Sequence, residues 1–288
     1  RNLRSQRTGA VGVLIPNLGN TFFSRILAGI ESTLARKGLS VLMVDTQHQT
    51  SQPDFIVDHL TDSRVDGILS LDGSLSPSLL KARHTETGLL PAVFACEWHE
   101  QGDHPSVRVD NRQGARQAIE HLIELGHTKI GLINGPQGNV LSQERLAGSL
   151  DTLKTAGLEI NTRWQFESDF SMQSGVCAAE SLLQLESRPT AIFCANDETA
   201  IGLISQLHQR GYQVPNDFSV VGFDDIDIAR HYLPPLTTIS QPRMELGKVA
   251  AQMLIELLDN KSTPELKPVE VLPVELIIRK TTAAPSSS

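Results

Sequence analysis

The sequence predicts an α/β protein of doubly wound architecture, with parallel sheets that carry helices on both faces. Apolar runs of strand length recur along the 288 residues, and most of them end in a polar or turn residue. Amphipathic stretches of helical length separate these runs. Continuous apolar runs are typical of strands buried on both faces of a parallel sheet. Their alternation with helices then indicates the doubly wound class.

The predicted strands are short and rich in aliphatic residues; they are residues 11–15, 41–45, 67–71, 92–97, 107–110, 130–134, 191–196 and 219–224. Between them, apolar side chains repeat at helical spacing. Three such helical faces are Ile26, Ile30 and Leu34; Ala118, Leu122 and Leu125; and Leu146, Leu150 and Leu153. Glycine ends several of these helices, at Gly38, Gly126, Gly157 and Gly211. Glycine adopts the left-handed conformation that commonly terminates a helix at little cost.

Length and composition favour a two-domain protein of the cytoplasm. A chain of 288 residues is long for one hydrophobic core. Its net charge of −8 argues against nucleic-acid binding by this chain alone, and only residues 1–7 are locally basic. No apolar run reaches the length of a membrane span, and no signal peptide is recognisable. The three cysteines are widely spaced, which favours reduced thiols and a cytoplasmic location.

The last third of the chain places polar side chains where strands end. Residues 193–247 read as strand, helix, strand, short helix, strand and helix. Asn196 and Asp197 follow the first strand, Asp224 and Asp225 the second, and Gln241 the third. Ligands of open parallel sheets bind outside the carboxyl ends of the strands. We therefore expect these side chains to surround a ligand-binding cleft.

Each of these carboxylates and amides also has a structural interpretation. Asp224 could accept two hydrogen bonds from a polyol, or it could cap a helix. Asp197 fits the N-cap of the helix predicted from Glu198 onward, which leaves Asn196 as the better ligand contact. Asp225 is better explained as a cap.

Aromatic and basic side chains supply further candidates. Of Phe22 and Phe23, one should face the core and the other could stack on a flat ligand. Trp98 could form a stacking wall or lie in a solvent-facing loop, and Phe170 could act as a lid or as a packing residue. Arg145, expected in the first turn of its helix, could donate paired hydrogen bonds to vicinal hydroxyls or form a surface ion pair.

Three more carboxylates that end strands, Asp45, Asp72 and Asp110, are second-tier candidates, each also suited to a turn. Glu97, which ends a strand beside Trp98, is a further second-tier candidate as a hydrogen-bond acceptor. The recognisable catalytic and phosphate-binding motifs GxSxG, HExxH, GxxxxGK[ST] and GxGxxG do not occur in the positions that would give them meaning. The cysteines lack metal-ligand spacing. We therefore expect neither catalysis, nor a metal, nor a cofactor.

At these residues the chain resembles the effector-binding core of the LacI/GalR family of bacterial transcription regulators. Similar segments occur in the family's order across nearly all of residues 8–282; they are VGVLIPNLGNTFFSRILAGIE, VRVDNRQGAR, HLIELGHTKIGLINGP, RLAGSLDTL, FCANDETAIG, VPNDFSVVGFDDIDIA, PPLTTISQPRMELG and LPVELIIRKTT. Within the family, the chain is most similar to the cytidine-responsive repressor branch.

The resemblance implies two doubly wound, parallel-sheet subdomains of the periplasmic binding protein-like type I, joined by three crossovers. The N-subdomain would comprise residues 8–110 and 240–268, and the C-subdomain residues 111–239 and 269–282. Residues 1–7 would be a linker after a missing DNA-binding region, and 283–288 a disordered tail. The family's effector contacts fall, by position, on Phe22, Phe23, Trp98, Arg145, Phe170, Asn196, Asp224 and Gln241.

The same resemblance implies a function. A small sugar or nucleoside would bind between the subdomains and control operator binding by a homodimer, whose DNA-contacting helices lie outside this chain. Purine-responsive relatives carry an Arg and a Thr where this chain has Asn139 and Leu141, which argues against a purine effector. The alternative is a periplasmic solute-binding protein for sugar transport, which shares the fold.

Overall fold

The computed structural model describes residues 8–47, 65–74, 84–85, 88–99, 104–259 and 269–286, and these form two compact units. The first unit comprises residues 1–109 and 242–272, and the second comprises residues 110–241 and 273–288. The chain therefore passes between the units at residues 109–110, 241–242 and 272–273. Each unit has its own six-stranded sheet.

The first unit is a parallel sheet in the order β13-β7-β6-β3-β1-β2. Its strands are β1 (Ala10–Ile15), β2 (Ser40–Asp45), β3 (Gly67–Ser70), β6 (Ala92–Ala95), β7 (Ser106–Val109) and β13 (Val269–Leu272). A separate antiparallel pair joins β4 (His84–Thr85) to β5 (Gly88–Leu89). Buried Leu14, Ile68 and Phe94 belong to the core beneath the sheet.

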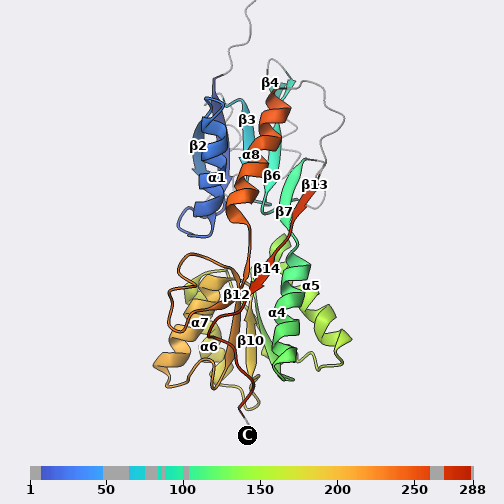
Figure 1. The fold of residues 1–288 in the computed structure, drawn as a ribbon, viewed down its shortest axis with the longest axis vertical. Coiled ribbons are helices and arrows are strands. Elements are labelled where there is room, and N and C mark those ends of the chain that lie inside the picture. The colour runs from blue at the N-terminus through green and yellow to red at the C-terminus, as the bar shows by residue number, and fades with distance from the viewer. Residues whose placement is uncertain are drawn as a thin grey trace, which may run out of the picture. The chain divides into compact units, whose positions relative to one another are not determined.

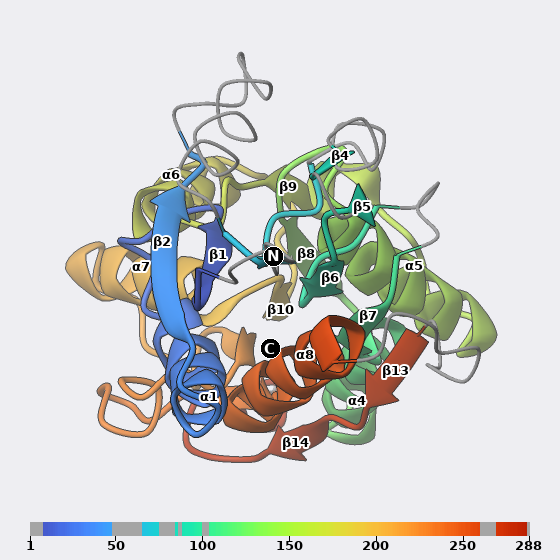
Figure 2. The same ribbon diagram turned by 90° about the horizontal axis from the view of Figure 1, so that it is seen from above.

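Helices α1 (Phe23–Ala35) and α8 (Arg243–Asp259) lie side by side against the sheet of the first unit (Figure 2). Two glycines, Gly29 on α1 and Gly247 on α8, allow their backbones to approach closely, because a Cβ on either would collide with the opposite helix. The chain segments that form this pair are more than 200 residues apart in sequence. Helix α8 packs against β3, β6 and β7, and α1 packs against β2.

The second unit is a mixed sheet in the order β14-β12-β11-β10-β8-β9, parallel except for the β12–β14 pair. Its strands are β8 (Ile130–Asn134), β9 (Gln165–Glu167), β10 (Ala191–Cys194), β11 (Ser219–Asp224), β12 (Thr237–Ser240) and β14 (Glu275–Ile277). The short 3₁₀ helix η1 (Thr162–Trp164) precedes β9.

Two helix pairs cover the opposite faces of this second sheet (Figure 1). One pair is α4 (Asn111–Glu124) with α5 (Val140–Thr155), and the other is α6 (Met172–Leu183) with α7 (Asp197–Gln209). A core that includes Ile119, Phe193 and Phe223 lies between α4, α5 and the strands. Because β8, β10, β11 and β12 run parallel, their polar carboxyl ends meet at one edge of the sheet.

The α/β class and the strands predicted from apolar runs are confirmed. The four glycines expected to end helices have positive φ angles of 70, 95, 68 and 86° at Gly38, Gly126, Gly157 and Gly211, in that order. The short helix expected after β11 is instead a series of turns over residues 227–230.

Two assignments near the C-terminus were wrong. We expected residues 269–282 in the second subdomain, but β13 pairs in parallel with β7 and belongs to the first unit. The tail expected to be disordered is held in place through residue 286: Ser219 hydrogen-bonds both the amide and the carbonyl of Ala283, and Ser286 donates to the Asn216 carbonyl. Residues 1–7, expected to be a linker, and residues 287–288 lie outside the described part.

Candidate functional site

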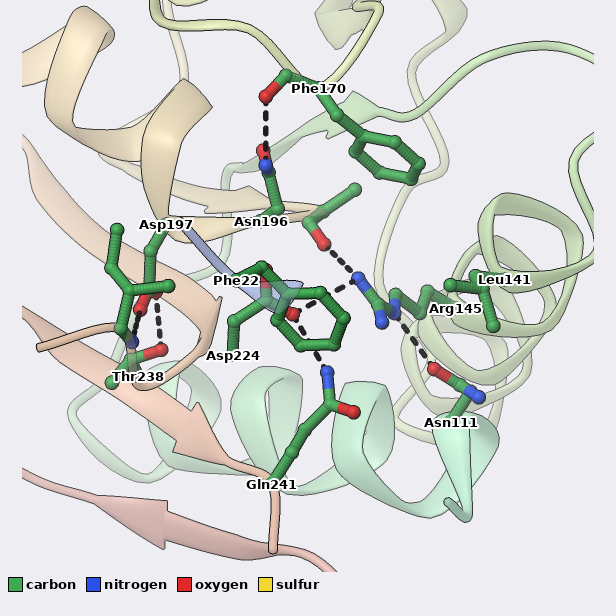
Figure 3. Close-up of polar contacts among 12 residues, drawn as sticks. Phe22, Asn111, Leu141, Arg145, Phe170, Asn196, Asp197, Asp224, Thr238 and Gln241 are labelled. Atoms are coloured by element: carbon green, nitrogen blue, oxygen red, sulfur yellow. Dashed lines mark hydrogen bonds and ion pairs between the residues drawn. The ribbon is translucent and has the colours of Figure 1, made fainter. Parts of the chain in front are cut away.

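A chain of buried polar contacts joins three predicted site residues at the carboxyl edge of the second sheet (Figure 3). Gln241 Nε2 donates to Asp224 Oδ1 at 2.7 Å. Arg145 Nη1 lies 3.7 Å from the same carboxylate oxygen. All three residues are buried: Gln241 and Asp224 are each 5 % exposed, and Arg145 is 2 % exposed. The structure thus brings together a carboxylate, an amide and a guanidinium that the sequence separates by almost 100 residues.

The guanidinium of Arg145 is fixed from several directions. Its Nε donates to Asn111 Oδ1 at 2.9 Å, and Nη1 donates to the Ala195 carbonyl. Its central carbon lies 3.8 Å from the centre of the Phe223 ring, within range of a cation–π interaction. Arg145 lies in the second turn of α5, not the first as expected. A surface ion pair, the alternative interpretation of this residue, is wrong because the side chain is buried.

The backbone turns sharply after β11, where the two adjacent aspartates lie. Asp224 and Asp225 have φ angles of 121 and 52°, a region that non-glycine residues rarely adopt. The Asp225 carboxylate forms an ion pair with Arg279 at 2.6 Å and caps no helix, contrary to expectation. Positive φ at two consecutive aspartates is sustained only when neighbouring contacts hold the turn.

Asp197 is one of those contacts. It is fully buried, and its carboxylate accepts hydrogen bonds from the Ile226 amide at 2.9 Å and from the Thr238 hydroxyl (Figure 3). Burial, followed by the charge of Asp224, raises the pKa of Asp197 well above its ordinary value. The expectation that Asp197 caps α7 was wrong: the N-cap is Asn196, whose side chain accepts from the Thr199 amide. The sequence indicated Asp197 only as a helix cap beside Asn196, and no sequence signal predicted that its carboxylate is buried.

Asn196 has a second contact that fixes the position of Phe170. Its Nδ2 donates to the Phe170 carbonyl at 2.8 Å. Phe170 has a φ angle of 67°, and its half-buried ring points toward α5 (Figure 3). The ring packs against Gly135, where a Cβ would overlap it. Asn196 therefore serves a structural role, as N-cap and as support for the Phe170 loop, besides being a candidate ligand contact.

The candidates of the first unit lie at or near the ends of its strands. Phe22 and Phe23 are both buried, with ring centres 5.1 Å apart, so burial does not divide them into a core and a ligand-facing residue. Arg243 donates to the Phe22 carbonyl at 3.2 Å. Trp98 lies in a loop and is half-buried, with Arg108 over its ring at 4.3 Å, so both interpretations of this residue stay open.

The second-tier carboxylates bind backbone amides. Asp45 accepts from Leu18 and Gln47, Asp72 from Ser74, and Glu97 from Gly73. Asp110 is the N-cap of α4, where it accepts from the Gln113 amide. These contacts agree with the turn and capping interpretations that the sequence left open.

Asn139 and Leu141 are the two positions at which the sequence argued against a purine effector. Asn139 caps α5 by accepting from the amides of Leu141 and Ser142. Its side-chain oxygen therefore serves its own helix, and Leu141 is a buried apolar residue.

Within the described residues, no group of three or more metal-ligating side chains could hold a metal ion. No helix among those residues is long and apolar enough to cross a membrane.

Comparisons with known proteins agree with this architecture. Residues 119–282 match the periplasmic binding protein-like domain. The HTH-type transcriptional repressor PurR of Aliivibrio salmonicida is 36% identical over 262 residues, which cover 91% of this chain and 78% of the relative. The HTH-type transcriptional repressor CytR of Escherichia coli K12 is 35% identical over 286 residues, 99% of this chain and 82% of the relative.

Solved structures give the same result. A LacI family transcriptional regulator from Enterococcus faecium, with bound ribose, superimposes with a TM-score of 0.87 at 29% identity over 96% of this chain and 99% of that one. The chain belongs to the LacI family of transcriptional regulators. The transcriptional regulator CelR, in complex with cellobiose, matches with a TM-score of 0.82 at 28% identity, over 96% of this chain and 85% of that one.

Family membership decides between the functions that the sequence left open. The chain is the effector-binding core of a LacI family repressor, and the similar solved regulators contain bound ribose or cellobiose. The relatives are repressors and not transport proteins, which removes support from the solute-transport alternative. The expectation that the protein is not an enzyme is confirmed by the same relatives. Similarity to CytR is consistent with the cytidine-responsive branch.

Proposed function

We propose that the second unit binds the hydroxyl groups of a pentose-containing effector, a sugar or a nucleoside, through Arg145, Asp224 and Gln241. The observation that carries the proposal is the buried polar chain at the sheet edge, with Gln241 donating to the Asp224 carboxylate beside the Arg145 guanidinium. A carboxylate accepts from hydroxyl groups, and a guanidinium donates to them. The similar regulator with bound ribose supports a pentose, and the similar regulator with bound cellobiose supports a carbohydrate ligand in general.

We further propose Phe22, Phe23, Trp98, Phe170 and Asn196 as ligand contacts, on the resemblance to the family. Alanine variants at these positions, titrated with the same ligand as the parent, test each one separately. Phe170 is the best supported, because its ring faces the helix that carries Arg145. Aromatic faces bind flat or apolar ligand surfaces, so the four variants at aromatic positions should weaken the binding of a nucleoside more than that of a free sugar.

In the complete protein, effector binding would change the affinity of a homodimer for operator DNA in the cytoplasm. Such coupling between two sites is about 1–3 kcal/mol, or roughly 5- to 150-fold in affinity. The names of the relatives as HTH-type repressors support this role. Light scattering of this chain at high micromolar concentration tests the dimer, and a monomer would contradict it.

Isothermal titration with ribose, cytidine, uridine and adenosine tests the site. Asp224→Asn should weaken the best ligand about 10-fold or more, because hydrogen bonds to a charged group contribute about 1.5–3 kcal/mol. The matched control is Asp151→Ala, since Asp151 lies on α5 in the same unit with an exposed side chain. Circular dichroism verifies that both variants are folded. If Asp224→Asn binds as tightly as Asp151→Ala, the site lies elsewhere.

A further inference from the structure

Two buried polar atoms near the candidate site lack a hydrogen-bond partner among the described residues: the Ser142 hydroxyl and Gln241 Oε1. Ser142 is 6 % exposed and Gln241 is 5 % exposed. Folded proteins pair nearly all of their buried polar atoms, so each exception has a cause. Gln241 already belongs to the candidate site, whereas Ser142 had no assigned role.

Ser142 is placed on the same face of α5 as Arg145. It is the third residue of the helix and lies three positions before Arg145, a spacing that puts side chains on one side of a helix. The Ser142 amide donates to the Asn139 cap, but its hydroxyl does not take part in that cap. The N-cap of α5 therefore does not account for the Ser142 hydroxyl.

The hydroxyl also lies beside an aromatic ring. A Cβ built on Gly135 would overlap both the Phe170 ring and Ser142 Oγ, so both groups border the same backbone position. Figure 3 shows the Phe170 ring directed toward this end of α5, near Leu141 and Arg145. A hydrogen-bonding group next to an aromatic face suits a ligand that is flat and carries polar atoms at its edge.

We infer that Ser142 is a specificity-determining contact, which hydrogen-bonds the edge of a heterocyclic base lying against Phe170, so that the site selects a nucleoside over a free pentose. The inference rests on the proposed function, in which Arg145, Asp224 and Gln241 bind the sugar hydroxyls. A nucleoside satisfies both halves of this arrangement: its pentose reaches the polar chain, and its base presents donors and acceptors to Ser142. A free pentose has no flat face and leaves the Ser142 hydroxyl unpaired.

Ser142→Ala should weaken nucleoside binding without destabilising the free protein. Removing an unpaired buried hydroxyl from the free protein should leave Tm unchanged or raise it by about 2 °C. The matched control is Ser149→Ala on the same helix, where the buried hydroxyl donates to the Arg145 carbonyl at 2.8 Å. Losing that satisfied contact should lower Tm instead.

Isothermal titration of the same variants with cytidine, uridine, adenosine and ribose completes the test. Ser142→Ala should weaken the best nucleoside about fivefold or more and change the ribose affinity less than about twofold. Ser149→Ala should retain the parent's affinity for both ligand classes. A fall in Tm for Ser142→Ala like that of Ser149→Ala would show a structural role and overturn the inference.

Asp224→Asn, measured beside these variants, separates failure of the inference from failure of the proposed function. If Asp224→Asn loses binding while Ser142→Ala keeps the nucleoside affinity, the proposed site stands and the role of Ser142 is overturned. If Ser142→Ala weakened the affinities for ribose and for the nucleoside equally, the proposed role of Ser142 in selectivity would be overturned. No binding of any of the four ligands at millimolar concentration would overturn both proposals.

Discussion

Replacing Asp197 should loosen the turn that positions Asp224. Asp197 is fully buried, and it accepts hydrogen bonds from the Ile226 amide and the Thr238 hydroxyl. The first of these donors follows directly after the two aspartates with positive φ. Because such backbone angles persist only when surrounding contacts hold them, Asp197 is the residue that we expect to keep Asp224 in place.

The cost of Asp197→Ala can be worked from these contacts. The substitution leaves two donors, one on the backbone and one on a side chain, buried without acceptors. Each unsatisfied buried donor costs about 1–3 kcal/mol. The loss is partly offset, because the substitution also removes a carboxylate whose burial is unfavourable. We expect a net destabilisation of about 2–4 kcal/mol, which for a unit of this size lowers Tm by roughly 4–15 °C.

The ionisation of Asp197 adds a dependence on pH with a defined sign. Its pKa in the folded protein is raised above the ordinary value of 3.8, so the folded state retains a proton that the unfolded chain releases. Stability from this group is therefore complete below pH 3.8 and declines as pH rises toward the folded pKa. Asp197→Asn cannot ionise, so its Tm deficit relative to the parent should be largest near pH 4 and shrink as pH rises.

Differential scanning fluorimetry between pH 4 and 8, with Asp151→Ala as the exposed control, measures both effects. Titration of the best ligand into Asp197→Ala then shows whether loosening the turn also weakens binding. A parent-like Tm and affinity for Asp197→Ala would refute the role of Asp197 as an anchor. A Tm difference between parent and Asp197→Asn that stays constant with pH would refute its raised pKa.

Two more stability predictions concern the same unit. Arg279→Ala breaks the ion pair with Asp225 and a hydrogen bond to the Leu236 carbonyl. Thermal melts should show that the free energy of unfolding falls by about 2 kcal/mol. The control is Arg116→Ala, which removes an exposed ion pair and should change the free energy of unfolding very little. His127 contacts Thr190, Ser219 and the Ala283 carbonyl, and burial lowers its pKa. As pH drops below 6.5, this histidine therefore gains a proton in the unfolded chain before it does so in the folded protein, and the stability of the folded protein falls. His127→Ala should lower Tm near pH 7.5 and weaken this acid dependence; an unchanged acid slope would contradict the prediction.

Much of the architecture could be predicted because its signals are local. Buried parallel strands such as Ser219–Asp224 are continuous apolar runs, and glycines end the helices between them. Polar residues at strand ends mark the edge where Asp224 and Gln241 meet, because all parallel strands of a sheet end on one side. The fold class therefore predicted that these two side chains lie at the same edge, whereas the hydrogen bond between them is known only from the structure.

Other features could not be predicted because they depend on contacts distant in sequence. Strand β13 alternates exposed and partly buried residues at the sheet edge between prolines, so it lacks the apolar run of a buried strand. Asp197 and Asn196 are adjacent polar residues at the start of one helix, and either could cap it. Only the positions of Ile226 and Thr238, brought close by the neighbouring strands, determine which residue turns inward.

The candidate site combines polar groups that are already fixed with groups that still lack a partner. Asn111, the Ala195 carbonyl and the Phe223 ring hold Arg145, and Gln241 is oriented by its bond to Asp224. Such groups lose little side-chain freedom when a ligand binds, and this saves about 0.5–1.5 kcal/mol for each side chain. Affinity for a pentose should then depend on supporting residues such as Asn111 as well as on the contacts themselves. Discrimination between pentose-containing ligands should depend on the unpaired Ser142 hydroxyl, because only a ligand that reaches it satisfies its hydrogen bond.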